Sequence, residues 1–190
     1  MTAHRLCPWW LGYYLACPAR RLVQDPASIL RSFVTEGMVV FEPGPGMGFF
    51  TLELARRVGP EGKVVAVDVQ PGMLEGLHSR AEKAGLLGRI DARLGRGDGM
   101  GIEDLKGRVD FVLAFAVVHE LPDAARFFAE AYDAMKPGGR LLLAEPAFHV
   151  SKREFAATLE TAQEQGLPTD SLPAIRWSRA AVLRKMPDAA

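Results

Sequence analysis

Short apolar runs alternate along the chain with longer amphipathic stretches whose apolar positions recur every three or four residues. The apolar runs have the length and composition of strands that are buried on both faces of a parallel sheet. We predict strands at residues 38–42, 63–68, 89–94, 109–118 and 140–146. The amphipathic stretches predict helices at residues 24–34, 49–58, 72–84, 123–135 and 151–165. Strands that are regularly followed by helices indicate a doubly wound α/β sheet.

The ends of these elements carry recognisable signals. Asp25 with Pro26 has the form of a helix N-cap followed by a first turn, and Ser151 with Glu154 has the spacing of a capping box. Residues 172–178 and 179–185 look like two further strands with almost nothing between them, which only an antiparallel hairpin allows. The predicted fold class is therefore α/β, a Rossmann-like sheet of seven strands that is mostly parallel and has an antiparallel C-terminal hairpin.

Composition adds limits to this fold. The 190 residues suit one domain, in which residues 1–36 form an N-terminal helical and aromatic segment and 37–190 the core. Lysine plus arginine equals aspartate plus glutamate at 23 each, so we expect neither nucleic acid nor a membrane as partner. Two cysteines, Cys7 and Cys17, make no disulfide framework, and the apolar segment around them is too short and aromatic for a signal peptide. We predict a cytoplasmic protein.

The turn after the first predicted strand carries three glycines at alternate positions, Gly44, Gly46 and Gly48. A dinucleotide site needs the spacing Gly-x-Gly-x-x-Gly, which this turn lacks. Glu42 stands two residues before the first glycine, where it would repel a phosphate and favour a ligand that carries an amine or a sulfonium cation. Pro43 and Pro45 fix the backbone of the turn but remove N–H donors, which again counts against a phosphate site.

The string "VVFEPGPGMGFFTLELA" resembles motif I of the class I S-adenosylmethionine-dependent methyltransferases, and the resemblance extends from Ser32 to Lys185. It implies S-adenosyl-L-methionine as cofactor. By the same resemblance Asp68 would accept the ribose hydroxyls, Met73 would lie against the adenine, and Asp98 would accept the adenine amino group. The residues that the resemblance assigns to the cofactor are Glu42, Gly44, Gly46, Gly48, Asp68, Val69, Met73, Asp98, Gly99 and Ala116.

Two later strings support the small-molecule branch of that family. "AVVHELPD" at residues 116–123 is similar to the segment after the fourth strand in methyltransferases of small molecules, lipids and quinones. "MKPGGRLLLAEP" at residues 135–146 is similar to the fifth-strand motif, in which "KPGG" is a tight entry turn. The resemblance therefore implies a small-molecule acceptor.

Methyl transfer from a sulfonium is an in-line displacement, and alignment with exclusion of water supplies much of its acceleration. An acceptor that carries a proton also profits from a base with a pKa near neutrality, which suits histidine. His119 follows the fourth strand and is our candidate base; Glu120, Glu145 and His149 are expected to gather near it. These four side chains do not have the spacing of a known metal site, so we expect no metal.

The N-terminal segment is rich in aromatic residues, and Trp10 and Tyr14 are candidates to fold over the acceptor. Together with Glu145 and His149 they form the predicted substrate set. A nicotinamide-dependent oxidoreductase and a cofactor-binding module without activity of its own remain alternatives. The sequence leaves the oligomeric state open, a dimer included.

Overall fold

The computed structural model of the chain describes residues 20, 22–95 and 99–187. These residues fall into two compact units: an N-terminal unit, whose described part ends at Gly95, and a C-terminal unit, whose described part runs from Gly99. The described residues contain seven strands, parallel in the pairs β1–β2, β2–β3 and β4–β5 and antiparallel in β5–β7 and β6–β7. The predicted fold class, a mostly parallel α/β fold with an antiparallel C-terminal end, is confirmed.

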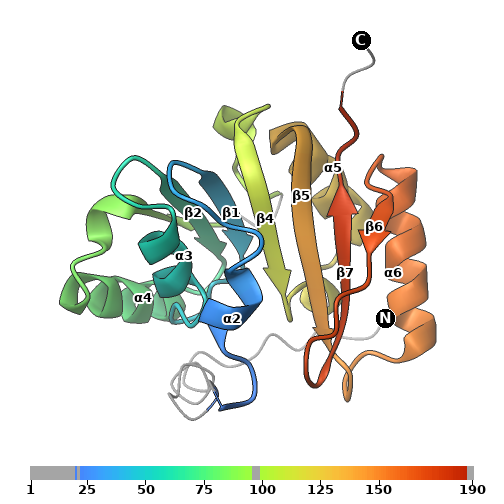
Figure 1. Cartoon of the computed structure of the whole chain (residues 1–190), viewed down its shortest axis with the longest axis horizontal. Helices are drawn as coiled ribbons and strands as arrows, with labels where there is room; N and C mark the ends of the chain where they lie inside the picture. Colours follow the sequence, from blue (N-terminus) through green and yellow to red (C-terminus); the bar gives the residue numbers. More distant parts are fainter. Residues whose placement is uncertain (1–19, 21, 96–98, 188–190) are drawn as a thin grey trace. The chain divides into compact units, whose positions relative to one another are not determined.

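The N-terminal unit is built on three parallel strands in the order β3-β2-β1. Its elements are α2 (Pro26–Leu30), β1 (Val39–Pro43), α3 (Thr51–Arg57), β2 (Lys63–Asp68), α4 (Pro71–Lys83), the 3-10 turn η3 (Leu87–Arg89) and β3 (Ile90–Leu94). The strand-to-helix connections place α3 and α4 on one face of these strands, as Figure 1 shows. β1 and β2 are almost entirely buried, as their unbroken apolar sequence predicts.

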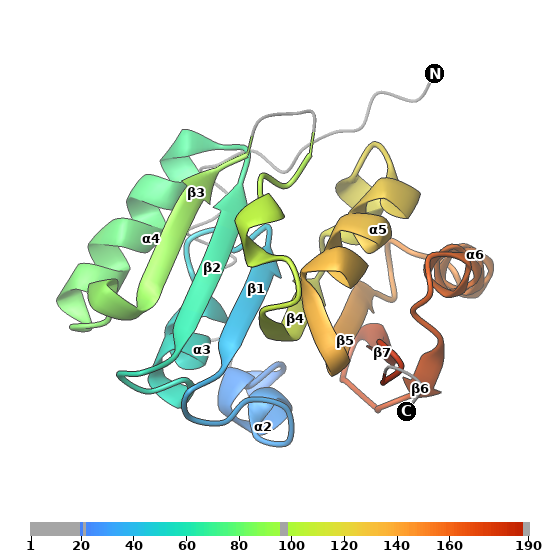
Figure 2. The same cartoon turned by 90° about the horizontal axis from the view of Figure 1, so that it is seen from above.

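The C-terminal unit combines a parallel pair with an antiparallel end, and β7 lies between β5 and β6 (Figure 1). Its elements are η4 (Glu103–Leu105), β4 (Val109–Phe115), η5 (Val118–Glu120), α5 (Ala124–Ala134), β5 (Met135–Pro146), α6 (Lys152–Glu164), β6 (Thr169–Ser171) and β7 (Ser178–Arg184). Helices α5 and α6 lie side by side (Figure 2). The predicted N-caps form at Asp25 of α2 and, as a full capping box, at Ser151 of α6.

Four predicted boundaries are wrong. The helix predicted at residues 24–34 is only the short α2, which ends at Leu30 and is followed by turns. The "KPGG" segment is not an entry turn but part of β5, where the pairing with β4 shifts between Val109 and Phe111 and leaves a bulge. The partner of β7 is not residues 172–178 but β6 at Thr169–Ser171, because Pro173 lacks an N–H and Trp177 has φ 62°. β4 stops at Phe115, because Ala116 turns into the left-handed region with φ 57°.

Within the described ranges, we find no helix that has both the length and the apolar character needed to cross a membrane.

Candidate functional site

The glycine turn that follows β1 requires glycine for its backbone. Gly44, Gly46 and Gly48 all have positive φ, at 63°, 54° and 82°. At Gly48 a Cβ would also lie 2.5 Å from the Cδ1 atom of Leu77 on α4, so a side chain there would require the buried Leu77 to move as well. At Gly46 the nearest side-chain atom to such a Cβ is the sulfur of Met73, at 3.9 Å. Two of the cofactor residues predicted from the sequence, Gly46 and Met73, therefore lie close together.

The chain itself fixes the shape of this turn. Asp68 at the end of β2 accepts hydrogen bonds from the backbone N–H of Gly46 at 3.2 Å and of Gln70 at 2.9 Å. Gly44 donates its N–H to the Val67 carbonyl at 2.9 Å, which continues the pairing of β1 and β2 past Pro43. Arg80 of α4 donates to the carbonyl of Met47 at 2.5 Å. The turn is consequently shaped before any ligand arrives, which favours binding because little ordering remains to be done.

Glu42, next to last in β1, is the unusual group of the N-terminal unit. Its side chain is buried at 4% exposure, and Oε2 has no hydrogen-bond partner among the described residues. The hydroxyl of Thr51, at the start of α3, is likewise buried without a partner. Burial raises the pKa of Glu42 to about 8; the adjacent Thr51 side chain, the next-largest cause, lowers it, and the charge of Asp68 raises it. An orphaned buried carboxyl at a ligand turn is a group that a cationic ligand would satisfy.

Asp68 is buried as well, but it is well supplied with donors. Burial raises its pKa above the ordinary value, while the backbone N–H groups that it accepts from act to lower it. A carboxylate has about four acceptor positions, so the two hydrogen bonds from Gly46 and Gln70 leave capacity for ligand hydroxyls. Val69, the next residue, is exposed, whereas Met73 is buried against the turn. This set fits a ligand with a ribose and a cationic group, as the sequence predicts.

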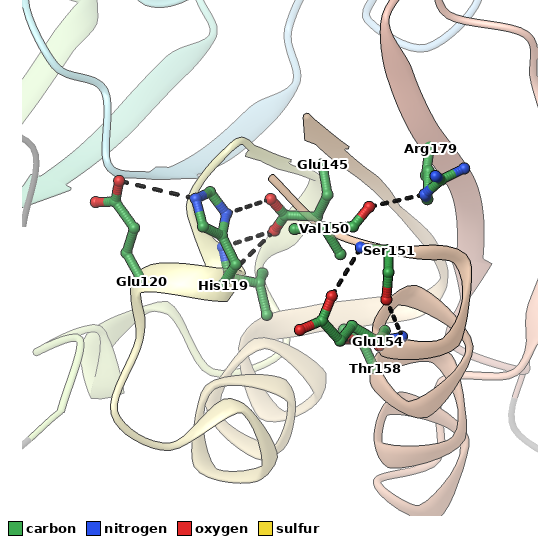
Figure 3. Close-up of polar contacts among 9 residues, drawn as sticks. His119, Glu120, Glu145, Val150, Ser151, Glu154, Thr158 and Arg179 are labelled. Carbon is green, nitrogen blue, oxygen red and sulfur yellow. Dashed lines mark hydrogen bonds and ion pairs between the residues drawn. The ribbon is translucent and has the colours of Figure 1, made fainter. Parts of the chain in front are cut away.

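The second cluster lies in the C-terminal unit, where β4 and β5 end (Figure 3). Glu145 of β5 is only 1% exposed, and its carboxyl group accepts three hydrogen bonds. The donors are the backbone N–H of Val118 at 2.9 Å, the backbone N–H of His119 at 3.3 Å and the imidazole Nδ1 of His119 at 2.5 Å. Glu145 therefore fixes both the backbone of η5 and the ring of His119. In this bond a carboxylate can only accept, so Nδ1 carries the proton.

The imidazole of His119 lies between two carboxyl groups (Figure 3). Its Nε2 atom is 3.9 Å from Oε1 of Glu120, and its side chain is 26% exposed. The hydrogen bond that His119 donates to Glu145 raises the pKa of His119, burial lowers it, and the charges of Glu145 and Glu120 raise it again. The ring of His149 is nearly parallel to that of His119, with centroids 6.3 Å apart. The structure thus brings together His119, Glu120, Glu145 and His149, the four residues expected to gather.

Two further predicted cofactor residues lie in the C-terminal unit. Ala116 follows β4 with φ 57° and donates its N–H to the carbonyl of Ala144 at 2.7 Å, which holds this strained backbone in place. Gly99 has φ 149°, and a Cβ there would lie 2.8 Å from atoms of both Arg126 and Glu130. Ala116 is thus restricted by its backbone, and Gly99 both by its backbone and by the side chains of Arg126 and Glu130.

Some predicted residues lie outside the described residues: Trp10, Tyr14 and Asp98, together with Cys7 and Cys17. Across residues 20, 22–95 and 99–187, no three histidine, cysteine, aspartate or glutamate side chains form a group that could hold a metal ion. Sequence reasoning missed Thr51 and Arg80, which contact the turn from two different helices. Thr51 stands out in the sequence as a hydroxyl in the first turn of an otherwise apolar helix start, whereas nothing marked Arg80.

Comparison with known proteins points in the same direction. Residues 40–139 match a family described as methyltransferase domain. The chain is similar to trans-aconitate 2-methyltransferase of Deinococcus radiodurans, 32% identical over 137 residues that make up 70% of this chain and 49% of that protein. It is also similar to arsenite methyltransferase of Halobacterium salinarum, 30% identical over 57% of this chain and 27% of that protein.

A third relative is a ubiquinone/menaquinone biosynthesis C-methyltransferase of a Marinomonas species, 27% identical over 62% of this chain and 46% of that protein. This chain thus spans half or less of the length of these relatives. Among solved structures, a SAM-dependent methyltransferase from Aquifex aeolicus superimposes with TM-score 0.83 at 25% identity. That match covers 95% of this chain and all of the other. Of the two enzyme classes that the sequence left open, these findings favour the methyltransferases.

Proposed function

Since the chain belongs to the methyltransferase domain family, with S-adenosylmethionine as cofactor, we propose that it methylates a small molecule whose reacting oxygen or nitrogen gives up a proton. The bound cofactor supplies an electrophilic methyl group for in-line displacement. Asp68 would hold the ribose, the glycine turn would hold the amino-acid part, and Glu42 would face the cationic side. The proposed site of action is the cytoplasm, with neither nucleic acid nor membrane as partner.

The observation that carries the proton-accepting step is the pairing of His119 with Glu145. Glu145 holds Nδ1 through a 2.5 Å hydrogen bond and is itself held by two backbone N–H groups. Nε2 of His119 is then the ring nitrogen with a free lone pair, on a side chain that is partly exposed. A neighbouring carboxylate makes a histidine a stronger base and fixes its orientation, which is the arrangement that general-base catalysis uses.

In this proposal Glu145 is a positioning residue. The sequence placed it among the substrate contacts, but a carboxyl group at 1% exposure with three internal donors acts more effectively through His119. His149, with its ring beside that of His119, remains the proposed substrate contact of this cluster. Trp10 and Tyr14 remain proposed substrate contacts on the strength of the sequence alone.

The small-molecule acceptor rests on two supports. The segment around His119 is similar to that of small-molecule methyltransferases, and two of the relatives named above carry trans-aconitate or quinone biosynthesis in their names. Neither support identifies the acceptor, so the decisive experiment must find it.

The test is a screen for label transfer from methyl-labelled S-adenosylmethionine into fractionated small-molecule extracts. We expect at least one fraction to be labelled by the wild type, and His119→Ala to label it far more slowly. The matched control is His78→Ala, which changes an exposed histidine on α4 and should label as the wild type does. If no fraction accepts label while the cofactor site is saturated, the chain is a binding module and the proposal is wrong.

A further inference from the structure

Glu42 lies in an environment that suits a neutral carboxylic acid better than a carboxylate. The side chain is buried, Oε2 lacks a hydrogen-bond partner within the described residues, and the neighbouring Thr51 hydroxyl lacks one too. Taking an ionised carboxylate out of water without donors costs several kcal/mol or more, and a group in that position keeps its proton instead. The Glu42 carboxyl is therefore stable there only in its neutral form until a cation enters the site.

Among the described residues of the N-terminal unit, 20 and 22–95, no cation is recorded as a partner of Glu42. Arg57 donates to Glu53 and to the Ala27 carbonyl, and Arg80 donates to the Met47 carbonyl. Arg20 lies over the ring of Phe49 and bonds Gln24. The other charged or titratable side chains on α3, α4, β2 and β3 are Glu53, Arg56, Glu75, His78, Glu82, Lys83, Lys63, Asp91 and Arg93. The charge that acts on Glu42 is that of Asp68, which is negative and makes the carboxylate still less favourable.

We infer that Glu42 keeps its proton in the free protein and releases it to solvent when the sulfonium cofactor binds, so that this one carboxyl favours the cofactor over the thioether product. The cofactor, S-adenosylmethionine, and its thioether product, S-adenosylhomocysteine, share the ribose, the adenine and the amino-acid group. They differ in one methyl group and one positive charge. A positive charge near a carboxyl in a low-dielectric site stabilises the carboxylate, and the thioether lacks that charge. Glu42 is thereby a specificity-determining residue for the cofactor.

The inference predicts how the affinity for the cofactor depends on pH. Because burial raises the pKa of Glu42 to about 8, the free protein holds the proton throughout the neutral range. Proton release on binding means that the affinity for the cofactor rises with pH up to about that value. Asp68 has a raised pKa as well, but it would meet the same ribose in both ligands, so its contribution cancels when they are compared. The affinity for the product should therefore change less with pH.

The test is calorimetric titration near pH 7 with S-adenosylmethionine and, separately, with S-adenosylhomocysteine. Running each titration in phosphate and in Tris, which differ strongly in ionisation enthalpy, yields the number of protons released. No acceptor is present, so the result depends only on cofactor binding and not on the base role proposed for His119. The wild type should release about half a proton or more with the cofactor beyond what it releases with the product.

Two variants identify the group that releases the proton. In Glu42→Gln the difference between the two ligands in the number of protons released should fall close to zero. A proton that came from the ligand's own amine would still be released in this variant, so the variant distinguishes the two sources. Glu53→Gln removes the same charge from α3, where Glu53 pairs with Arg57, and should behave as the wild type does. A wild type that releases equal numbers of protons with both ligands overturns the inference. So does a difference that survives in a folded Glu42→Gln protein.

A second measurement, on the wild type alone, tests the inference even if Glu42→Gln does not fold. In the wild type, the ratio of cofactor affinity to product affinity should rise at least about threefold between about pH 6 and pH 8. A ratio that stays flat or falls over this range overturns the inference without any variant.

Discussion

Two buried glutamates, one in each unit, show how far the same side chain can diverge in chemistry. Glu42 is 4% exposed and Glu145 is 1% exposed. Glu42 has an oxygen without a partner and a pKa raised to about 8, whereas Glu145 accepts from two backbone N–H groups and one imidazole. Burial is almost equal, so the difference comes from the donors that surround each carboxyl.

The donors follow from local backbone geometry. η5 turns the N–H groups of Val118 and His119 toward the end of β5, where Glu145 stands. At the end of β1 the nearby N–H groups of the glycine turn are already bonded, with Gly44 on Val67 and Gly46 on Asp68. A carboxyl that is satisfied internally can orient a base, whereas one that is unsatisfied is left for a ligand.

The largest expected effect concerns His119, the histidine that Glu145 orients. His119→Ala should lower methyl transfer to the identified acceptor by about 10²- to 10⁴-fold, because it removes the general base. Binding of S-adenosylhomocysteine, measured by calorimetry, should stay unchanged. Normal turnover in His119→Ala would show that the Glu145–His119 pair has only a structural role.

The next effect concerns the Glu42 side, where Asp68 is the second carboxyl. Asp68→Ala should weaken S-adenosylhomocysteine binding by about 100-fold or more, because it removes the proposed ribose acceptor, the hydrogen bond that holds the turn at Gly46 and the one at Gln70 before α4. Asp91→Ala is the matched control, since Asp91 pairs with Arg93 on β3 and with Lys63 on β2. Equal affinities in the two variants, measured by calorimetry, would remove Asp68 from the site.

Replacing each of the two glutamates by glutamine should give a smaller effect, seen in the free energy of unfolding. Glu145→Gln should lower the free energy of unfolding by about 2 kcal/mol, because an amide cannot accept from all three donors. Glu42→Gln should change it by less than about 1 kcal/mol near pH 6, because it replaces a neutral acid by a neutral amide. Urea denaturation followed by circular dichroism measures both, and equal losses would abolish the distinction.

The pH dependence of stability sharpens the same contrast. Between the ordinary glutamate pKa and about 8, the folded protein holds a proton on Glu42 that the unfolded chain has released. The free energy of unfolding therefore falls as pH rises through this interval, by up to about 1.4 kcal/mol per pH unit. Urea titrations of the wild type and Glu42→Gln should differ by this slope. Parallel profiles would mean that Glu42 ionises normally.

The periodic pattern of the sequence predicted the parallel strands and the helices that follow them, since apolar runs such as 63–68 have few other ways to be buried. It also placed His119 and Glu145 at neighbouring strand ends. It could not predict that residues 136–139 belong to β5, because "KPGG" equally suits a turn. These residues have no partner on β4, and Gly138 and Gly139 instead bond the backbone of Lys185, which is far away in sequence. Nor could it separate the two glutamates, because hydrogen-bond donors come from residues far away in sequence, such as His119 for Glu145.

The most direct measurement of this contrast is an NMR titration of the glutamate side-chain carboxyl carbons in the ligand-free protein. We predict that one glutamate titrates with a midpoint near 8, and that its signal disappears in Glu42→Gln but persists in Glu53→Gln. If every glutamate carboxyl of the wild type instead titrates below about pH 6, Glu42 is charged in the free protein and the contrast between the two glutamates is wrong.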